Sequence, residues 1–241
     1  LNFFPSAAVS YKMNDKNNLQ WSLSRRITRP GQWDLLPFMK FGDNREMRQG
    51  NANLNPELTY STEVTWMHYL KKGSILTSMY YRHTVDKIER IAYYGTDGII
   101  YRMPLNIASR DAYGLEAIGN YQLTNWLRFN TSFNFFREQI SGEYMGTSFD
   151  RDNFTWNNRS SLNFALPKGI KFQVSGQYDA PRLSAQGKIL SMRWMDLAAS
   201  KDIWKNKATV GVNLRDVFNS RRFRSVTDTP EIYSENDFQW R

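Results

Sequence analysis

The chain has 241 residues, of which 41% are hydrophobic, and its 32 Lys and Arg against 23 Asp and Glu give a formal net charge of +9. No run approaches about 18 apolar residues, which excludes a helical membrane bundle but leaves a membrane β-barrel open, because barrel strands alternate apolar and polar residues. The 15% aromatic content is too high for a disordered basic chain, and the absence of cysteine excludes disulfide scaffolds, thiolate zinc sites and Cys nucleophiles.

The dominant periodicity is two, which is typical of strands with one apolar and one polar face. The pattern predicts about ten strands, which in chain order cover 6–13, 18–28, 57–71, 74–91, 107–123, 127–140, 153–166, 170–180, 189–203 and 207–217. A change of phase within the ninth of these predicts a β-bulge. An eleventh strand is expected to begin near Phe238, Gln239 and Trp240.

Short and long connections alternate between these strands. Short polar connections fall at 14–17, 71–73, 124–125, 167–169 and 205–207, and longer ones at 29–56, 93–105, 141–152, 181–188 and 219–230. This order predicts an all-β, antiparallel, up-and-down transmembrane β-barrel with one short-turn rim and one long-loop rim.

Aromatic residues near the short turns support this orientation, because their amphipathic rings favour the headgroup layer. They are Tyr11, Tyr69, Tyr121, Trp126 and Trp204. The alternative is a soluble β-sandwich whose inward face carries the same apolar residues. The long strands and the regular alternation of loop lengths favour the membrane interpretation.

The two ends of the sequence predict that it is a piece of a larger barrel. Residues 1–5 lack the basic region and apolar core of a signal sequence. The eleventh strand stops soon after it starts, and hydrocarbon penalises an unpaired strand edge.

Two motifs resemble those of TonB-dependent outer-membrane receptors. The first runs from Ser24-Arg25-Arg26-Ile27-Thr28-Arg29-Pro30 through Asp34-Leu35-Leu36-Pro37-Phe38 to Gly50-Asn51-Ala52-Asn53-Leu54-Asn55-Pro56-Glu57. The second is the late strand that ends in Asp216-Val217-Phe218-Asn219. The chain is most similar to the outer membrane protein beta-barrel branch that is common in Bacteroidetes-type bacteria, from which Ala52 departs where the pattern has Pro.

This resemblance implies a bacterial outer-membrane barrel of about 22 strands filled by a plug domain. Residues 1–241 would form a C-terminal part of the barrel, with about ten to eleven strands, and the plug and the final strand would lie outside the sequence. The implied function is import of a bulky, scarce nutrient such as a siderophore, glycan or peptide, driven from the inner membrane. The implied partners are outer-membrane lipid and lipopolysaccharide, the TonB complex through the missing N-terminal region, and, as a further candidate, a surface lipoprotein.

We expect the motif residues to shape the beginnings and ends of strands rather than to touch ligand. They are Arg25, Arg26, Pro30, Gly50, Asn51, Asn53, Leu54, Pro56, Glu57, Asp216, Phe218 and Asn219. Gly50 would tolerate a positive φ, and Asn51 and Asn53 suit turns and left-handed positions. Pro56 would begin a strand, where its missing N–H is tolerable, and Glu57 would lie beside Arg-rich loop segments.

Catalysis is poorly supported, because His68 and His83 have no serine, carboxylate pair or third ligand at a convincing spacing. We therefore expect no enzyme, no metal site and no cofactor. Two other functions remain as alternatives: a structural or secretion-associated barrel without uptake, and a self-contained barrel protease of about ten strands. Discriminating observations are an upstream plug for the receptor and loss of an activity on His68 or His83 substitution for the protease.

The positive charge is spread over strands and loops, which argues against nucleic acid as a partner. Many arginines fall near the long-loop rim, where phosphorylated lipopolysaccharide and anionic cargo offer partners. Loop aromatics there could stack on a ligand ring. The ligand candidates are Trp33, Arg45, Arg48, Tyr94 and Tyr101. A lumen-facing polar set is expected to line the barrel or hold the plug: Arg110, Glu116, Arg128, Asn130, Arg159 and Gln173.

Overall fold

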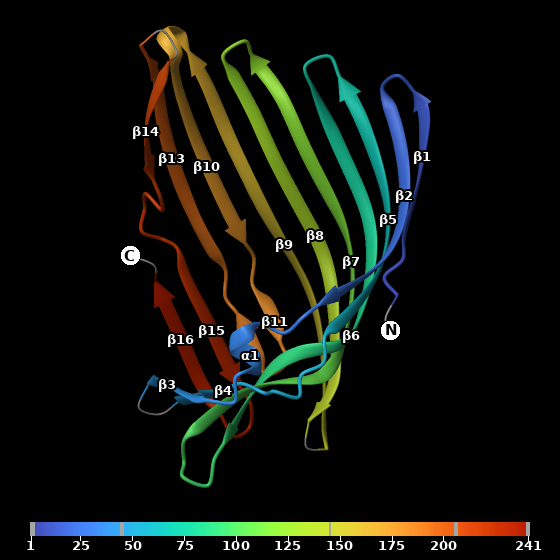
Figure 1. Ribbon diagram of the computed structural model, residues 1–241, viewed down its shortest axis with the longest axis vertical. Helices are drawn as coiled ribbons and strands as arrows, with labels where there is room; N and C mark the ends of the chain where they lie inside the picture. Colours follow the sequence, from blue (N-terminus) through green and yellow to red (C-terminus); the bar gives the residue numbers. More distant parts are fainter. Residues whose placement is uncertain (1–2, 44–45, 145, 205–206, 240–241) are drawn as a thin grey trace.

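A computed structural model describes residues 3–43, 46–144, 146–204 and 207–239, and it shows a tall, curved antiparallel wall (Figure 1). The wall strands pair in the order β1-β2-β5-β6-β7-β8-β9-β10-β13-β14. Their bounds are β1 Ser6–Asn14, β2 Asn17–Thr28, β5 Glu57–Leu70, β6 Gly73–Tyr94, β7 Ile100–Thr124, β8 Leu127–Tyr144, β9 Thr147–Leu166, β10 Ile170–Asp179, β13 Met192–Ile203 and β14 Ala208–Leu214. All ten predicted strands are therefore present, and the all-β fold class is confirmed.

The five short turns lie together at the upper end of Figure 1. In the turn that joins β9 to β10, Lys168 and Gly169 have positive φ values of 63° and 70°, a conformation that glycine adopts at little cost. The long connections lie at the opposite end, as expected. We call these two ends the short-turn rim and the long-loop rim.

The wall has an apolar convex face and a polar concave face. Cross-strand partners share a face, and the ladder aligns Phe164 with Phe172 and Val174 with Leu197 on the convex one. Phe133 and Val212 are 36% and 60% exposed, so no second sheet encloses them. The sandwich alternative is therefore wrong.

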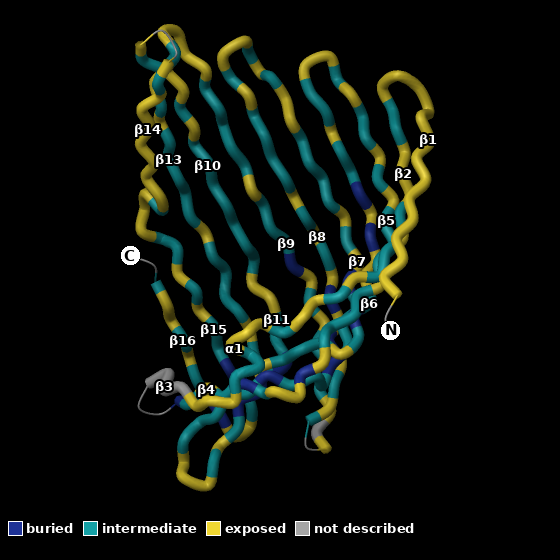
Figure 2. The backbone as a smooth tube through the Cα atoms, viewed as in Figure 1, coloured by how far each residue is buried: buried dark blue, intermediate teal, exposed yellow. Residues whose placement is uncertain are grey.

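Many of the buried residues gather at the long-loop rim, and others, such as Ser78 and Tyr80 on β6, lie within the wall (Figure 2). At this rim a four-stranded sheet, in the order β11-β12-β15-β16, meets the outer ends of β6 and β7 and the β3–β4 hairpin. The bounds are β3 Met39–Asp43, β4 Glu46–Gln49, β11 Arg182–Ser184, β12 Gly187–Ile189, β15 Arg222–Asp228 and β16 Tyr233–Gln239, with a single-turn helix α1 at Gln32–Leu35. We call this the rim assembly, and Ile91, Ala92, Ala185 and Ile232 are almost fully buried in it.

The long connections thus contain more strand than their sequences indicate. The expected loop at 93–105 shrinks to a tight turn between β6 and β7, and the one at 141–152 shrinks similarly between β8 and β9. These strands run on beyond the wall and pair with each other, so residues that look like loop satisfy their backbone hydrogen bonds in a ladder. β16 likewise begins at Tyr233, earlier than expected, while Trp240 lies outside the described residues.

The predicted bulge within 189–203 is wrong. β12 ends at Ile189, β13 begins at Met192, and the ladder between β10 and β13 runs from Asp179↔Met192 to Ile170↔Lys201 without a register shift. The change of phase arises because Trp194 lies on the polar face, opposite Gln177. A register shift occurs instead between β6 and β7, beside Asp86, whose φ is 54°.

No helix in the described ranges is long and apolar enough to cross a membrane.

Candidate functional site

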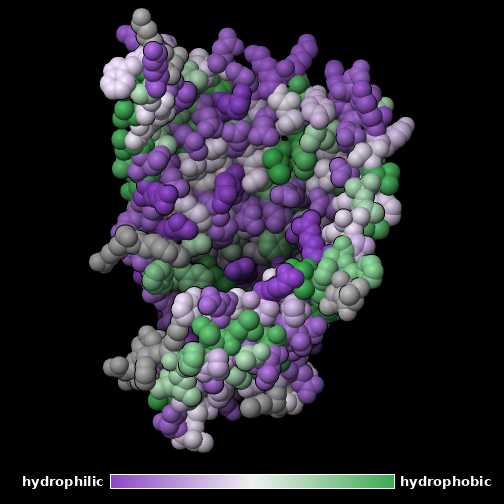
Figure 3. Space-filling view, viewed as in Figure 1, coloured by the Kyte–Doolittle hydropathy of each residue, from purple (hydrophilic) through white to green (hydrophobic). Residues whose placement is uncertain are grey.

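Two adjoining hollows, of about 450 and 650 Å³, lie on the concave face of β7 to β14. Hydroxyl and carboxamide side chains make up most of the lining of the smaller hollow, and the larger one also has apolar residues such as Phe164 and Phe172. Hydrophilic residues cover much of the hollowed surface in Figure 3. We call the pair the concave trough. Its polar lining residues include Asn120, Gln122, Arg128, Asn130, Arg159, Ser161, Asn163, Gln173, Ser175, Gln177, Asp196 and Asn213, and Trp194 lies beside them.

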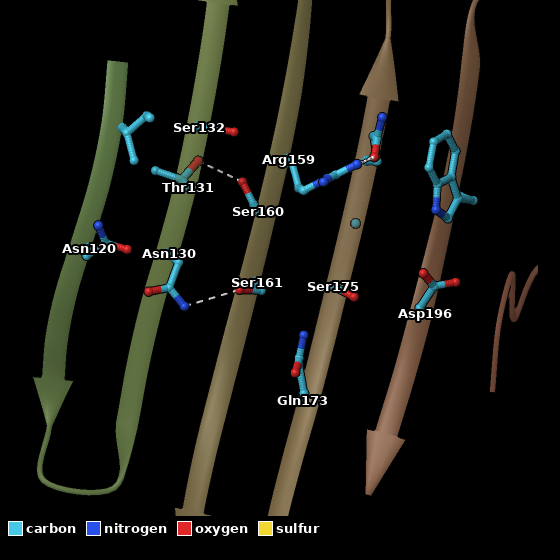
Figure 4. A pocket seen from close by; sticks show the side chains of 14 residues that line it. Asn120, Asn130, Thr131, Ser132, Arg159, Ser160, Ser161, Gln173, Ser175 and Asp196 are labelled. Carbon is cyan, nitrogen blue, oxygen red and sulfur yellow. Dashed lines mark hydrogen bonds between the residues drawn. The ribbon is translucent and has the colours of Figure 1, made fainter. Parts of the chain in front are cut away.

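A row of cross-strand partners shows how this lining arises. Successive partners Asn120↔Asn130, Asn130↔Ser161 and Ser161↔Ser175 place one amide or hydroxyl on each neighbouring strand. Figure 4 shows how these side chains follow one another across the wall. Because successive side chains point to opposite faces, polar residues at every second position of neighbouring strands form a continuous polar surface.

Part of the trough is organised by its own hydrogen bonds. Arg159 Nε donates to Gln177 Oε1 at 2.9 Å, and Gln177 Nε2 donates to Asp179 Oδ2 at 3.1 Å. Trp194 on β13 has the guanidinium of Arg221, the residue before β15, 4.6 Å from its ring centre, a cation–π arrangement. These contacts fix the arginine and tryptophan side chains in place.

Other trough residues keep their hydrogen-bonding groups available. Within the described ranges, the side chains of Asn120, Arg128, Gln173 and Ser175 make no hydrogen bond or ion pair. An amide offers both donors and acceptors, so this surface can bind a polar molecule or another part of the protein.

The predicted lumen-facing set is largely recovered. The trough contains Arg128, Asn130, Arg159 and Gln173. Arg110 lies nearer the long-loop rim, where its Nη2 is 2.7 Å from Glu138 Oε2. Sequence reasoning missed Trp194 and Asp196, although the change of phase in that segment was a signal for the former.

The ligand candidates at the long-loop rim do not form one cluster. Trp33 is 68% exposed in α1, and Tyr94 is 48% exposed at the end of β6. Tyr101 stacks on Tyr93 with 5.7 Å between ring centres, and its hydroxyl donates to Asp97 Oδ2 at 2.9 Å. Arg45 lies outside the described residues.

The Asp97 carboxylate stabilises the tip of the β6–β7 hairpin. The backbone N–H of Ile99 donates to Oδ1 at 3.1 Å, and this bond together with the Tyr101 hydroxyl holds the pKa of Asp97 below its usual value. Tyr101 thus has a structural partner of its own.

Arg48 belongs to an ion-pair network inside the rim assembly. Its Nε donates to Glu46 Oε1 at 3.0 Å, and Glu46 Oε2 lies 2.9 Å from Arg102 Nε. Burial acts to raise the pKa of Glu46, but the two guanidinium groups, Arg102 foremost, more than offset this and hold it below the ordinary value. The Arg102 guanidinium also donates to the hydroxyls of Thr227 and Ser234 at 3.0 and 3.3 Å.

The first motif clamps its segment to the bend between β6 and β7. Asn106 Nδ2 donates to the backbone oxygens of Asn55 and Asp86 at 3.0 and 2.6 Å, and Asn106 Oδ1 accepts the Asn55 N–H at 2.7 Å. Glu57 Oε1 accepts from Lys87 Nζ and from the Ile88 N–H, both at 2.9 Å. The partner of Glu57 is therefore a lysine on β6 and not the expected arginine segment.

The asparagines form a turn, as expected, but the expected positive φ values are absent. None of Gly50, Asn51 and Asn53 has a positive φ. Asn51 Oδ1 accepts the Asn53 N–H at 3.0 Å, which is an Asx turn. A Cβ on Gly50 would lie 2.2 Å from Leu36 O, so glycine is required by close backbone approach.

The second motif turns the chain between β14 and β15. Asp216 and Asn219 have φ values of 47° and 50°, and the Asp216 carboxylate accepts the N–H groups of Ser220 and Arg221 at 2.8 and 2.9 Å. The Asp216 N–H itself donates to Asp196 Oδ1 at 2.8 Å. This turn therefore fixes the Asp196 side chain at the edge of the trough, while Phe218 is 69% exposed.

The two histidines lie apart on the β5–β6 hairpin, on the convex face. His68 is aligned with Ile75 and His83 with Tyr60. His68 Nδ1 lies 2.8 Å from Asn17 Oδ1 near the short-turn rim, and His83 Nδ1 lies 2.8 Å from Asp111 Oδ1. His83 is thus outside the lumen, and the described residues contain no group of three or more potential metal ligands.

Solved structures share this fold over nearly the whole chain. The ferric yersiniabactin uptake receptor FyuA from Yersinia pestis superposes with a TM-score of 0.63 at 13% identity, covering 98% of this chain and 35% of that one. For the copper transporter OprC the values are 0.62, 16%, 98% and 38%. For the siderophore receptor PirA from Pseudomonas aeruginosa they are 0.61, 14%, 91% and 37%.

The chain thus spans little more than a third of the length of these structures. No curated protein matches it. The outer membrane protein beta-barrel family matches it over residues 1–241. The wall has an apolar convex face, a polar concave face, short turns at one end and long connections at the other. The chain belongs to the outer membrane protein beta-barrel family and resides in the bacterial outer membrane.

Proposed function

We propose that this chain is part of the wall of a TonB-dependent receptor that imports a bulky, scarce nutrient. The observation that carries the proposal is the concave trough, a polar surface with available amides behind a lipid-facing wall. Such a surface can bind a polar cargo, because amides that make no hydrogen bond within the described part of the protein offer both donors and acceptors to a solute. The resemblance to receptors for siderophores and to a copper transporter supports the same class.

In this proposal residues 1–241 form a C-terminal part of the barrel, and a plug and the remaining strands belong to other parts of the protein. The TonB complex would act through the N-terminal region, and a surface lipoprotein remains a candidate partner. Cargo would arrive at the long-loop rim, where Trp33, Arg48, Tyr94 and Tyr101 stay predicted ligand contacts. Import itself requires no covalent chemistry from these residues.

Uptake by cells with and without the full-length protein tests this function. Labelled ferric siderophore, oligosaccharide and peptide are the three probes. We expect at least one to accumulate only in cells that carry the protein, and accumulation to stop when a protonophore collapses the inner-membrane gradient. Uptake of all three that is unchanged by deletion, or by the protonophore, would contradict the proposal.

A matched pair of variants connects uptake to the trough. Gln173→Ala removes an available amide from the trough, whereas Gln20→Ala removes an exposed amide from β2, remote from it. We expect only the first to reduce uptake, and equal reductions would exclude a role for the trough.

A further inference from the structure

The hairpin formed by β11 and β12 reaches across the wall to β6. In the wall, β7, β8 and β9 lie between β6 and β10, the strand that leads into this hairpin. Because the wall is curved, a direct contact between β6 and the hairpin has to span its concave side (Figure 1). We call residues 184–187, at the tip of the hairpin, the strap.

Hydrogen bonds hold the strap on β6 and β9. The Ala92 N–H donates to Gln186 Oε1 at 2.6 Å, and Gln186 Nε2 donates to Ala92 O at 3.0 Å. Arg151 Nε on β9 donates to Ala185 O at 3.1 Å. The Ala185 N–H donates to the carboxylate of Glu89 on β6. Since Ala185 is almost fully buried, the carboxylate of Glu89 lies inside the contact between the strap and β6.

Glu89 belongs to a group of covered charges in which acids outnumber bases. Its side chain is 13% exposed, and those of Glu57 and Glu138 are covered to a similar extent. Lys87 Nζ lies 2.9 Å from Glu57 Oε1, and Arg110 Nη2 lies 2.7 Å from Glu138 Oε2. Each cation is thus bonded to another carboxylate, while Glu89 Oε1 lies 3.9 Å from Lys87 Nζ. Glu89 is therefore the acid whose negative charge is least compensated, and a buried charge without close compensation is costly.

The other charged groups near the strap do not correct this imbalance. Arg151 approaches from β9, but its Nε is occupied by the strap backbone. On the hairpin itself, Arg182 and Lys188 are exposed to solvent. Arg90 follows directly on β6 and so points to the other face of that strand, where its Nη2 lies 2.7 Å from Asp34 Oδ1.

Docking of the strap is therefore linked to protonation. Burial raises the pKa of Glu89 above its ordinary value of 4.5, and the charge of Glu57 acts in the same direction. Lys87, the Ala185 N–H and Arg110 offset this only in part. When the strap leaves β6 the carboxylate regains water, and its pKa returns toward the ordinary value. The protonated form thus favours docking: its contribution is complete below the ordinary pKa and is lost as the pH rises through the raised one.

We propose that the strap is a proton-controlled latch, which is docked on β6 while Glu89 carries a proton and is released when that proton is lost. The carbonyl oxygen of a protonated carboxyl group still accepts the Ala185 N–H, so docking keeps this bond while the uncompensated charge disappears. Ionisation restores the charge beside Glu57. It weakens docking about tenfold for each unit by which docking raises the pKa of Glu89.

Distances between two nitroxide labels, measured by pulsed electron spin resonance on the full-length protein, test the latch. Lys188→Cys carries one label beside the strap, and Met79→Cys carries the other on the lipid-facing side of β6; both positions are exposed. Any cysteine outside these 241 residues is replaced by serine. We expect one narrow distance at about pH 5 and a second, broader population that grows at least about threefold by about pH 8.

Two matched variants identify the titrating group. Glu89→Gln places a neutral carboxamide where the protonated carboxyl would be, and it should keep the narrow distance at both pH values. Glu143→Gln neutralises an exposed acid at the outer end of β8 and should keep the pH dependence of the unaltered protein. Equal pH dependence in the two variants would assign the titration to another group and overturn the proposal.

The protein with Glu89 intact already decides the question if Glu89→Gln does not fold. Identical distances at both pH values, or broadening in acid, would refute the latch. Gln186→Ala removes both bonds to Ala92 and should give the broad population at both pH values, and a narrow distance in this variant would also count against the latch. None of these measurements involves cargo, so their failure would leave the proposed import function standing.

Discussion

Gly50 lies where the backbone of residues 50–51 runs close to the backbone of residues 34–36. Its N–H donates to Leu36 O at 3.1 Å, and the next residue, Asn51, donates to Asp34 O at 2.6 Å. The two bonds hold residues 50–51 against residues 34–36, at the end of α1. Any side chain at this position would have to separate them.

We therefore predict that Gly50→Ala loosens this segment. The added Cβ would meet Leu36 O at 2.2 Å, a distance that forces the backbone apart. Limited proteolysis of intact cells should show faster cleavage within 29–56. Gly176→Ala is the control, because its Cβ would have no neighbour closer than 3.9 Å, and equal cleavage in both variants would contradict the explanation.

Glu46 gives a prediction that depends on pH. Its folded pKa lies below the ordinary value of 4.5, so the ionised carboxylate stabilises the rim assembly above that value, and the contribution is lost as the pH falls through the lowered pKa. Glu46→Gln should cost about 3 kcal/mol at neutral pH, because it leaves the Arg102 guanidinium buried without its counter-charge. Unfolding in detergent, measured at pH 7 and at acid pH, should show the difference between the two proteins shrinking in acid, and a constant difference would count against this pair.

At the residue scale the sequence indicated which positions are structural but not their partners. The motif residues are expected to shape strand ends, and three of them, Asn51, Glu57 and Asp216, accept backbone N–H groups. Their contacts, such as Asn55 with Asn106 and Glu57 with Lys87, join segments separated by 51 and 30 residues. Periodicity along one strand contains no information about which distant residue will lie opposite a carboxylate.

The wall strands that line the trough face lipid on one side and the trough on the other. Val174 and Ser175 are neighbours on β10, with Val174 aligned with Leu197 and Ser175 with Asp196. The difference between the two environments can therefore be measured at two adjacent positions of one element.

We predict opposite tolerance of arginine at these two positions. Val174→Arg should destabilise the protein by about 2–4 kcal/mol in lipid vesicles, because a charge on the lipid face of a barrel strand loses its hydration. Ser175→Arg should cost less than about 1 kcal/mol, because the trough is wet. Urea unfolding in phosphatidylcholine vesicles measures both, and equal costs would mean that the faces have been assigned wrongly.

At the element scale the wall was predictable and the rim assembly was not. Alternation defines a strand wherever one face meets an apolar medium and the other meets water. Beyond the membrane both faces of β6, β7 and β8 contact protein or water, so the alternation fades and their outer ends look like loops. The trough could be inferred as a polar face, but its shape depends on which strands are neighbours.

The two ends of the molecule differ, and because the sequence contains no cysteine, its orientation across the membrane is easy to test with introduced thiols. A single introduced cysteine is then the only thiol in this part of the protein. The five short turns lie at one end and the rim assembly at the other, and in barrels of this kind the long connections face outward from the cell.

We predict that Asp97→Cys in intact cells reacts with a membrane-impermeant maleimide, whereas Lys72→Cys reacts only after the outer membrane is permeabilised. Asp97 is at the tip of the β6–β7 hairpin and Lys72 is in the turn between β5 and β6. Both positions are exposed, so accessibility to the reagent depends on the side of the membrane alone. The reverse pattern would invert the orientation.

The separation of bonded residues along the chain has a consequence for biogenesis. The wall is built from consecutive hairpins, each of which can form as it is delivered to the membrane. Gln186 bonds to Ala92 across 94 residues and Arg102 to Ser234 across 132. Such contacts of high sequence separation are slow to form. A half-assembled intermediate should therefore persist in which the ends of β6 and β7 lack support until β11 to β16 have folded against them, and these ends should be its most protease-sensitive part.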